Sequence, residues 1–311
     1  MHLSVLAFAL AFPAHAGVVR APVEIGRPGI SAPLGSPMPT LPSYLSVANP
    51  EDRIVLAEIV HAAQASPTAV AVLAQVARTA EASGRPVVIE VLNMKESGTY
   101  NLDWGILSLR RQDMKNGPHT NVSTLIHELQ HLLQTQRALP SDLLETELES
   151  YLLDFRVGRE MGDTPRRGSY DERAQAAFKR GFEPFMEFLA KEYPEDSPMW
   201  KTRSRAYAAR LRKGLSASEA KLDSLAKSRV ERLRVLEQMR GLGHLEPELR
   251  NYRQDSIGPL DAMIETMTRA VEWARKDLAI LADPVTRDQA RAYARSVVRR
   301  ARAYQKIFAR D

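Results

Sequence analysis

The 311-residue sequence predicts an α+β protein in which helices predominate. Three observations support this fold class. Ala, Leu, Arg and Glu are abundant while aromatic residues make up only 6% of the chain, a composition that favours helices. Short β-branched runs typical of strands occur early, between residues 85 and 111. Beyond residue 140 the pattern is helical throughout, with proline or glycine at most junctions.

The N-terminal residues have the outline of a secretory signal peptide, which we place at 1–16. Residues 3–12 are apolar, and Ala14, His15 and Ala16 form a small-x-small cleavage signature. An apolar core of about ten residues is too short for a stable membrane anchor. We therefore expect an exported protein, periplasmic or extracellular. The chain has no cysteine, which excludes a disulfide framework and thiolate chemistry.

Residues 17–50 are rich in Pro, Gly and Ser and lack periodicity, so they predict a leader or linker. Residues 51–83 predict two helices interrupted at Pro67. A β-branched run predicts a strand at 87–91, and a second strand is centred on 106–109.

The remaining chain predicts helices. One runs from about 122 to 136, where Thr120 or Asn121 can provide the N-terminal cap. The next begins after Pro140 and ends near Gly162. Further helices are expected at 172–192, 198–213, 216–240, 247–281 and 286–309. The predicted organisation is an α+β domain at 51–195 followed by an all-helical domain at 196–311.

The sharpest chemical signature is His127-Glu128-Leu129-Gln130-His131. Residues four apart on a helix lie one turn apart on the same face, so both imidazoles can bind one Zn²⁺ ion. The glutamate beside the first histidine then reaches the open coordination position and takes the proton of a water molecule. The motif lies in an apolar helix, where such groups are costly without partners. It therefore predicts a catalytic zinc site with Glu128 as general base.

A third protein ligand is required, because catalytic zinc normally has three. The Gly and His of the metzincin extension are absent after His131. The following helix is instead rich in carboxylates, including Glu145, Glu147 and Glu149. Projection of that helix places Glu145 and Glu147 at opposite borders of its apolar face and Glu149 further out. Helical phase alone therefore does not favour Glu149.

Residues 85–160 resemble the short gluzincins, or minigluzincins, of the zincin group of metallopeptidases. Their pattern is a strand, an HExxH helix, and a helix with a glutamate followed by a small residue, matched here by Glu149 and Ser150. The resemblance implies a zincin-like domain with His127, His131 and Glu149 as zinc ligands, Glu147 being our second choice. It also implies that the strand around 106–109 binds an extended peptide by edge pairing.

The expected function is zinc-dependent hydrolysis of peptides or proteins. The chain has a net charge of +5, and basic residues recur every four positions near its C-terminus, at Arg287, Arg291, Arg295 and Arg299. This stripe predicts the solvated face of a helix and at most a weak contact with an anionic surface. We expect no specific nucleic acid partner. The alternative function is a non-catalytic helical binding protein that uses this basic face, with a structural zinc site or none.

Overall fold

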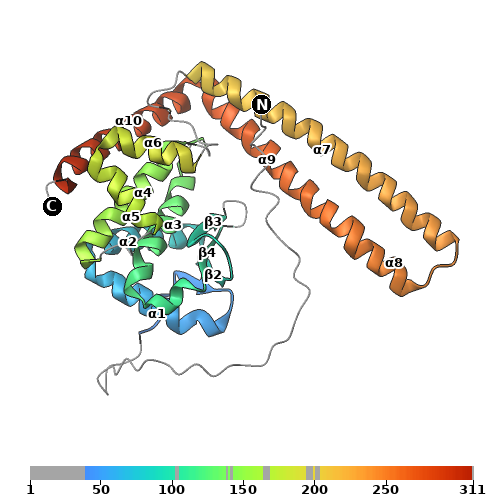
Figure 1. The fold of residues 1–311 in the computed structure, drawn as a ribbon, viewed down its shortest axis with the longest axis horizontal. Coiled ribbons are helices and arrows are strands. Elements are labelled where there is room, and N and C mark those ends of the chain that lie inside the picture. Colours follow the sequence, from blue (N-terminus) through green and yellow to red (C-terminus); the bar gives the residue numbers. More distant parts are fainter. Residues whose placement is uncertain are drawn as a thin grey trace.

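The computed structural model describes residues 39–101, 105–137, 139–140, 143–163, 169–193, 199 and 204–309 (Figure 1). The signal peptide expected at 1–16 lies outside the described residues. The predicted fold class is confirmed, because a small mixed sheet is accompanied by helices over most of the chain. Among the described residues, no helix combines the length and apolar character needed to cross a membrane.

The sheet has four strands in the order β1-β2-β4-β3. Strands β1 (Leu45–Val47), β2 (Val87–Leu92) and β4 (Ile106–Arg110) are parallel, and β3 (Gly98–Asn101) runs antiparallel to β4. The expectation that the strand around 106–109 forms an edge is wrong, since β4 pairs with a strand on each side. The edge beyond β4 is instead β3, which is short and carries no β-branched run.

Three helices pack with this sheet around one core: α1 (Arg53–Ala62), α2 (Pro67–Ser83) and α3 (His119–Thr135). The predicted break at Pro67 is confirmed, and the Ser66 side chain caps α2 by accepting from the N–H of Ala69. The predicted cap of the motif helix is wrong. Helix α3 begins before Thr120, and the Asn121 amide instead donates to the carbonyls of Asp113 and Gly117.

A second core joins α4 (Leu144–Met161), α5 (Tyr170–Arg180), α6 (Phe182–Glu192) and α10 (Pro284–Phe308). The single helix predicted at 172–192 is two helices, because Gly181 between them has φ +141, which ends α5. Aromatic rings from all four helices meet in this core. Helix α10 therefore belongs to the body of the protein, next to the helix that follows the motif (Figure 1).

A long hairpin of helices projects from this body (Figure 1). Helix α7 (Ser204–Gly241) packs along α8 (Glu246–Tyr252), a π-helical turn (Arg253–Ile257) and α9 (Gly258–Ala282). From Ser204 onward, the helices predicted at 198–213 and 216–240 are one continuous helix, and residues 198 and 200–203 of the first prediction lie outside the described residues. Gly214 does not interrupt it, since a glycine costs a helix interior only about 1 kcal/mol relative to alanine.

The outer face of α10 carries the predicted basic stripe. Arg295 and Arg299 are exposed, whereas Val297 and Ala301, on the opposite side of the helix, are buried in the second core. The amphipathic helix expected here is therefore present. Contact of its basic face with an anionic surface stays a prediction.

Candidate metal centre

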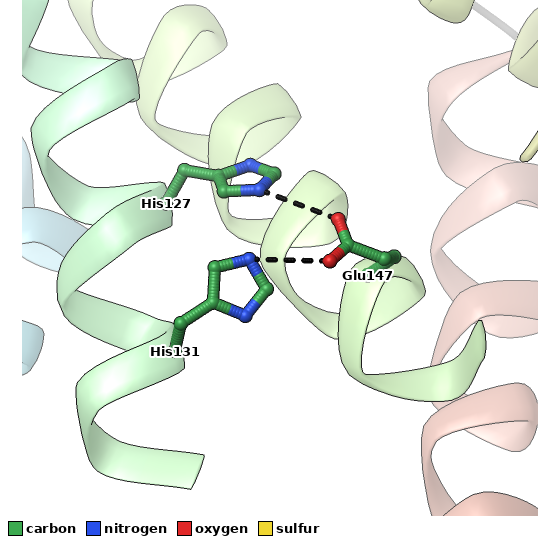
Figure 2. Close-up of side chains that lie close together, drawn as sticks. All are labelled: His127, His131 and Glu147. Carbon is green, nitrogen blue, oxygen red and sulfur yellow. Dashed lines mark ion pairs between the residues drawn. The ribbon is translucent and has the colours of Figure 1, made fainter. Parts of the chain in front are cut away.

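Helices α3 and α4 bring three potential metal ligands together. His127 Nε2 lies 3.6 Å from Glu147 Oε2, and His131 Nε2 lies 3.5 Å from Glu147 Oε1 (Figure 2). The two rings extend from successive turns of α3 toward the carboxylate on α4. One donor atom from each residue lies within 4.8 Å of the others, and no second group of this kind occurs among the described residues.

The opposite nitrogen of each imidazole is held by an acceptor. His127 Nδ1 lies 2.8 Å from Asp154 Oδ2, and His131 Nδ1 lies 2.9 Å from Gln134 Oε1. A proton on Nδ1 satisfies both contacts and leaves Nε2 as the nitrogen of each ring that is directed toward Glu147. Such outer hydrogen bonds commonly fix the orientation and tautomer of metal-binding histidines.

The arrangement of the three residues suits binding of a shared metal ion better than direct hydrogen bonds between them. The nitrogen–oxygen separations of 3.5 and 3.6 Å exceed the length of a good hydrogen bond. Glu147 Oε2 is buried and has no hydrogen-bond partner, which is costly for a carboxylate oxygen. Two imidazoles and one carboxylate are also a known donor set for catalytic zinc. The residues therefore suit a metal ion held between the two helices.

The charges of the site strongly affect one another. Burial lowers the pKa of His127, but Asp154 and Glu147 outweigh it and hold that pKa well above its usual value. Burial dominates at His131 and lowers its pKa. Burial raises the pKa of Glu147, but the two histidines outweigh it and lower that pKa. The site thus already places negative charge where a cation would be held.

Glu128 lies beside this group, against edge strand β3. The N–H of Tyr100 donates to its carboxylate, while burial raises the pKa of Glu128 to about 8 against the opposing effect of His127. Gly98 on β3 lies so close that an added Cβ would come within 2.8 Å of Glu128 Cγ and Oε1. The strand therefore positions the carboxylate, and the glycine leaves room for it.

Glu149, our first choice for the third ligand, is placed elsewhere. Residues two apart on a helix are rotated by about 200°, so Glu147 and Glu149 point to different sides of α4. Glu147 faces the histidines, whereas Glu149 Oε2 accepts from Gln130 at 2.8 Å and from Arg137 at 3.0 Å. The structure thus reverses the order of preference expected from the sequence. Our second choice, Glu147, joins His127 and His131.

The contacts of two neighbours with His127 were not predicted from the sequence. Asp154 holds His127, and the Tyr151 ring lies edge-on to the same imidazole with centroids 4.9 Å apart. Glu147, Tyr151 and Asp154 are spaced i, i+4 and i+7, which places them on one face of α4. This spacing is a signal that the sequence contained. The apolar face of the helix obscured it, because the Tyr151 ring also packs in the second core.

Gly98 provides a test of how Glu128 is positioned. If Glu128 is the general base expected from the sequence, Gly98→Ala should lower hydrolysis by about tenfold to a hundredfold, because displacing a reacting group by about 1 Å can cost this much. Metal content should not change, since the candidate ligands lie on α3 and α4. Turnover and metal content of the purified variant would be measured together. Gly158→Ala is the control, because its Cβ would meet nothing within 4 Å. Equal activity in both variants would refute the positioning role.

Comparison of this chain with protein-family models, curated proteins and solved structures gives no match. Its chemistry must therefore be inferred from its own residues.

Proposed function

We propose that this protein is a zinc-dependent peptidase in which Glu128 acts as general base toward a water molecule. One observation carries the proposal. Both histidine Nε2 atoms face the same buried carboxylate, Glu147, while both Nδ1 atoms are held by acceptors. A cluster with a purely structural role does not require a second carboxylate beside it. Glu128 is such a carboxylate, and the Tyr100 N–H holds it separately from the other three residues.

When bound, zinc supplies a Lewis acid that lowers the pKa of water and polarises a carbonyl. The residues of the chain supply the rest. Glu128, held by the Tyr100 N–H, takes a proton from the attacking water and delivers it to the leaving amine. Asp154 holds His127 in one orientation, and the Tyr193 hydroxyl lies beside the Glu147 carboxylate.

The position of β3 favours a peptide as substrate. Among the described residues this strand pairs only with β4, so its other edge presents backbone N–H and C=O groups. An extended peptide can add to such an edge by main-chain hydrogen bonds. Its backbone would then pass close to Glu128, which contacts β3 at Gly98 and Tyr100. We therefore propose that the substrate pairs with β3, and not with the strand around 106–109 that was expected from the sequence.

Metal analysis tests this function directly. Purified protein should contain about one zinc ion per chain, and a chelator should abolish cleavage of an unfolded protein such as casein. Chelation should also lower stability, by about 4 kcal/mol where free zinc had been 1,000 times its Kd. Readdition of zinc should restore both. Protein without zinc, or cleavage that survives chelation, would contradict the proposal. Zinc-free protein that binds anionic vesicles would support the alternative of a helical binding protein.

A further inference from the structure

Glu149 is a buried carboxylate at the meeting point of three helices. It accepts hydrogen bonds from Gln130 and Gln134 on α3 and from Arg137, which lies just after the end of α3. It also accepts from Tyr293 at 2.8 Å and Arg300 at 2.5 Å, both on α10. Burial raises the pKa of Glu149, but these guanidinium groups and hydrogen bonds outweigh it and lower that pKa. Helix α10 thus helps to hold a carboxylate charge inside the body of the protein.

This carboxylate and the Thr146 carbonyl together determine which way the Gln134 amide points. Gln134 Nε2 lies 3.0 Å from the carbonyl of Thr146 and 3.1 Å from Glu149 Oε2. Both of these oxygens only accept hydrogen bonds, so the NH₂ group must face them. The Gln134 carbonyl oxygen is therefore the atom that faces His131.

The orientation of that amide in turn determines the tautomer of His131. Gln134 Oε1 lies 2.9 Å from His131 Nδ1 and can only accept, so Nδ1 must carry the proton. His131 Nε2 is then unprotonated and directed toward Glu147, 3.5 Å from Oε1. With the amide reversed, its oxygen would be repelled by the Thr146 carbonyl and the Glu149 carboxylate.

We propose that α10, acting through Glu149 and Gln134, sets His131 in the tautomer that can bind a metal. Gln134 and Glu149 are then positioning residues, and docking of the C-terminal helix is needed for a fully competent site. This inference rests on the proposed zinc site. It also assigns a role to α10, which follows the motif by more than 150 residues in sequence and lies beside α4 (Figure 1).

Two buried glutamines on α3 allow a matched test. Gln130 and Gln134 are equally buried, at 5% exposure, and both donate to Glu149, but only Gln134 contacts His131. We expect Gln134→Leu to weaken zinc binding by about tenfold to a hundredfold, as measured by competition with a chelator. Gln130→Leu removes a donor to Glu149 but no contact with His131, so it should weaken zinc binding by a clearly smaller factor than Gln134→Leu. Nitrogen NMR of the metal-free protein should show His131 protonated at Nδ1 in the parent and in Gln130→Leu, but as a tautomer mixture in Gln134→Leu.

A second variant tests the contribution of α10 without changing any residue of the motif helix α3. The double variant Tyr293→Phe, Arg300→Gln removes both α10 donors to Glu149. It should weaken zinc binding in the same direction as Gln134→Leu but by a smaller factor. Arg299→Gln, a neighbouring exposed residue, is the control and should have no effect.

The outcomes separate this inference from the zinc proposal itself. A parent protein that binds no zinc would refute the proposed function. A parent that binds zinc, together with parental zinc affinity and a parental His131 tautomer in Gln134→Leu and in the α10 double variant, would overturn the positioning role. Equal loss of affinity in Gln130→Leu and Gln134→Leu would overturn it as well.

Discussion

The Glu128→Gln variant should keep its zinc ion and lose about a hundredfold to ten-thousandfold in hydrolysis, the range that a general base contributes. Glutamine has nearly the same shape as glutamate and can still accept from the Tyr100 N–H, so the local packing should be retained. It cannot take a proton from water. The measurements are kcat on a substrate that the parent cleaves and zinc content of the same preparation.

A matched carboxylate makes this result specific. Glu96 precedes the same edge strand but is exposed, and Glu96→Gln should leave both turnover and zinc content unchanged. Parental turnover in Glu128→Gln would exclude Glu128 as the base. Loss of zinc from that variant would instead indicate that Glu128 is a ligand, because His127 and His131 would then lack an anion the site requires.

The local part of the site could be predicted from the sequence. His127 and His131 are four residues apart in one helix, so the geometry of the helix alone places them on one face. The position of Glu128 next to the first histidine follows in the same way. These relations depend on hydrogen bonds within a single helix and not on how helices pack against one another.

The choice between Glu147 and Glu149 could not be made in this way. It depends on how α4 is rotated against α3, which the packing of both cores determines. The apolar face of α4 suggested solvent exposure for Glu149, yet Glu149 is only 4% exposed because Arg137 and Arg300 accompany it. A buried carboxylate with distant partners looks like a surface residue when only its own helix is considered.

Two short strands and the full length of α7 could not be predicted either, because both depend on contacts with other parts of the chain. Strands β1 and β3 have three and four residues, too few for an alternating pattern to be recognised. They form because neighbouring strands supply their hydrogen bonds. Conversely, Gly214 suggested a helix end, but packing of α7 along α9 outweighs the cost of one glycine.

Isosteric substitution of the two competing glutamates should give opposite results. Glu147→Gln should weaken zinc binding by at least about a hundredfold, more than loss of a residue that only orients a ligand. Metal-free stability should change by less than about 1 kcal/mol. Glu147 Oε2 makes no hydrogen bond, so the amide removes only the attraction of the carboxylate to His127 and His131, and relief from burying a charge offsets part of that loss.

Glu149→Gln should instead destabilise the metal-free protein by about 2 to 3 kcal/mol. Its amide would direct NH₂ hydrogens at donors and leave Arg137 and Arg300 without a counter-charge. The arginine side chains are 39% and 55% exposed, so water compensates part of the loss and the effect stays below that of a fully buried pair. Zinc affinity should fall less than in Glu147→Gln, because Glu149 acts only through Gln134.

Urea unfolding of the metal-free proteins and chelator competition for zinc measure the two effects separately. If Glu149→Gln lost zinc while keeping its metal-free stability, Glu149 would be the ligand after all, and α4 would have to rotate on metal binding. Rotation by the required angle of about 200° would expose the face of α4 that now packs in the second core. The buried aromatic contacts of Phe155 with Phe178 and Phe308 oppose such a change, which is the physical reason for expecting Glu147 to remain the ligand.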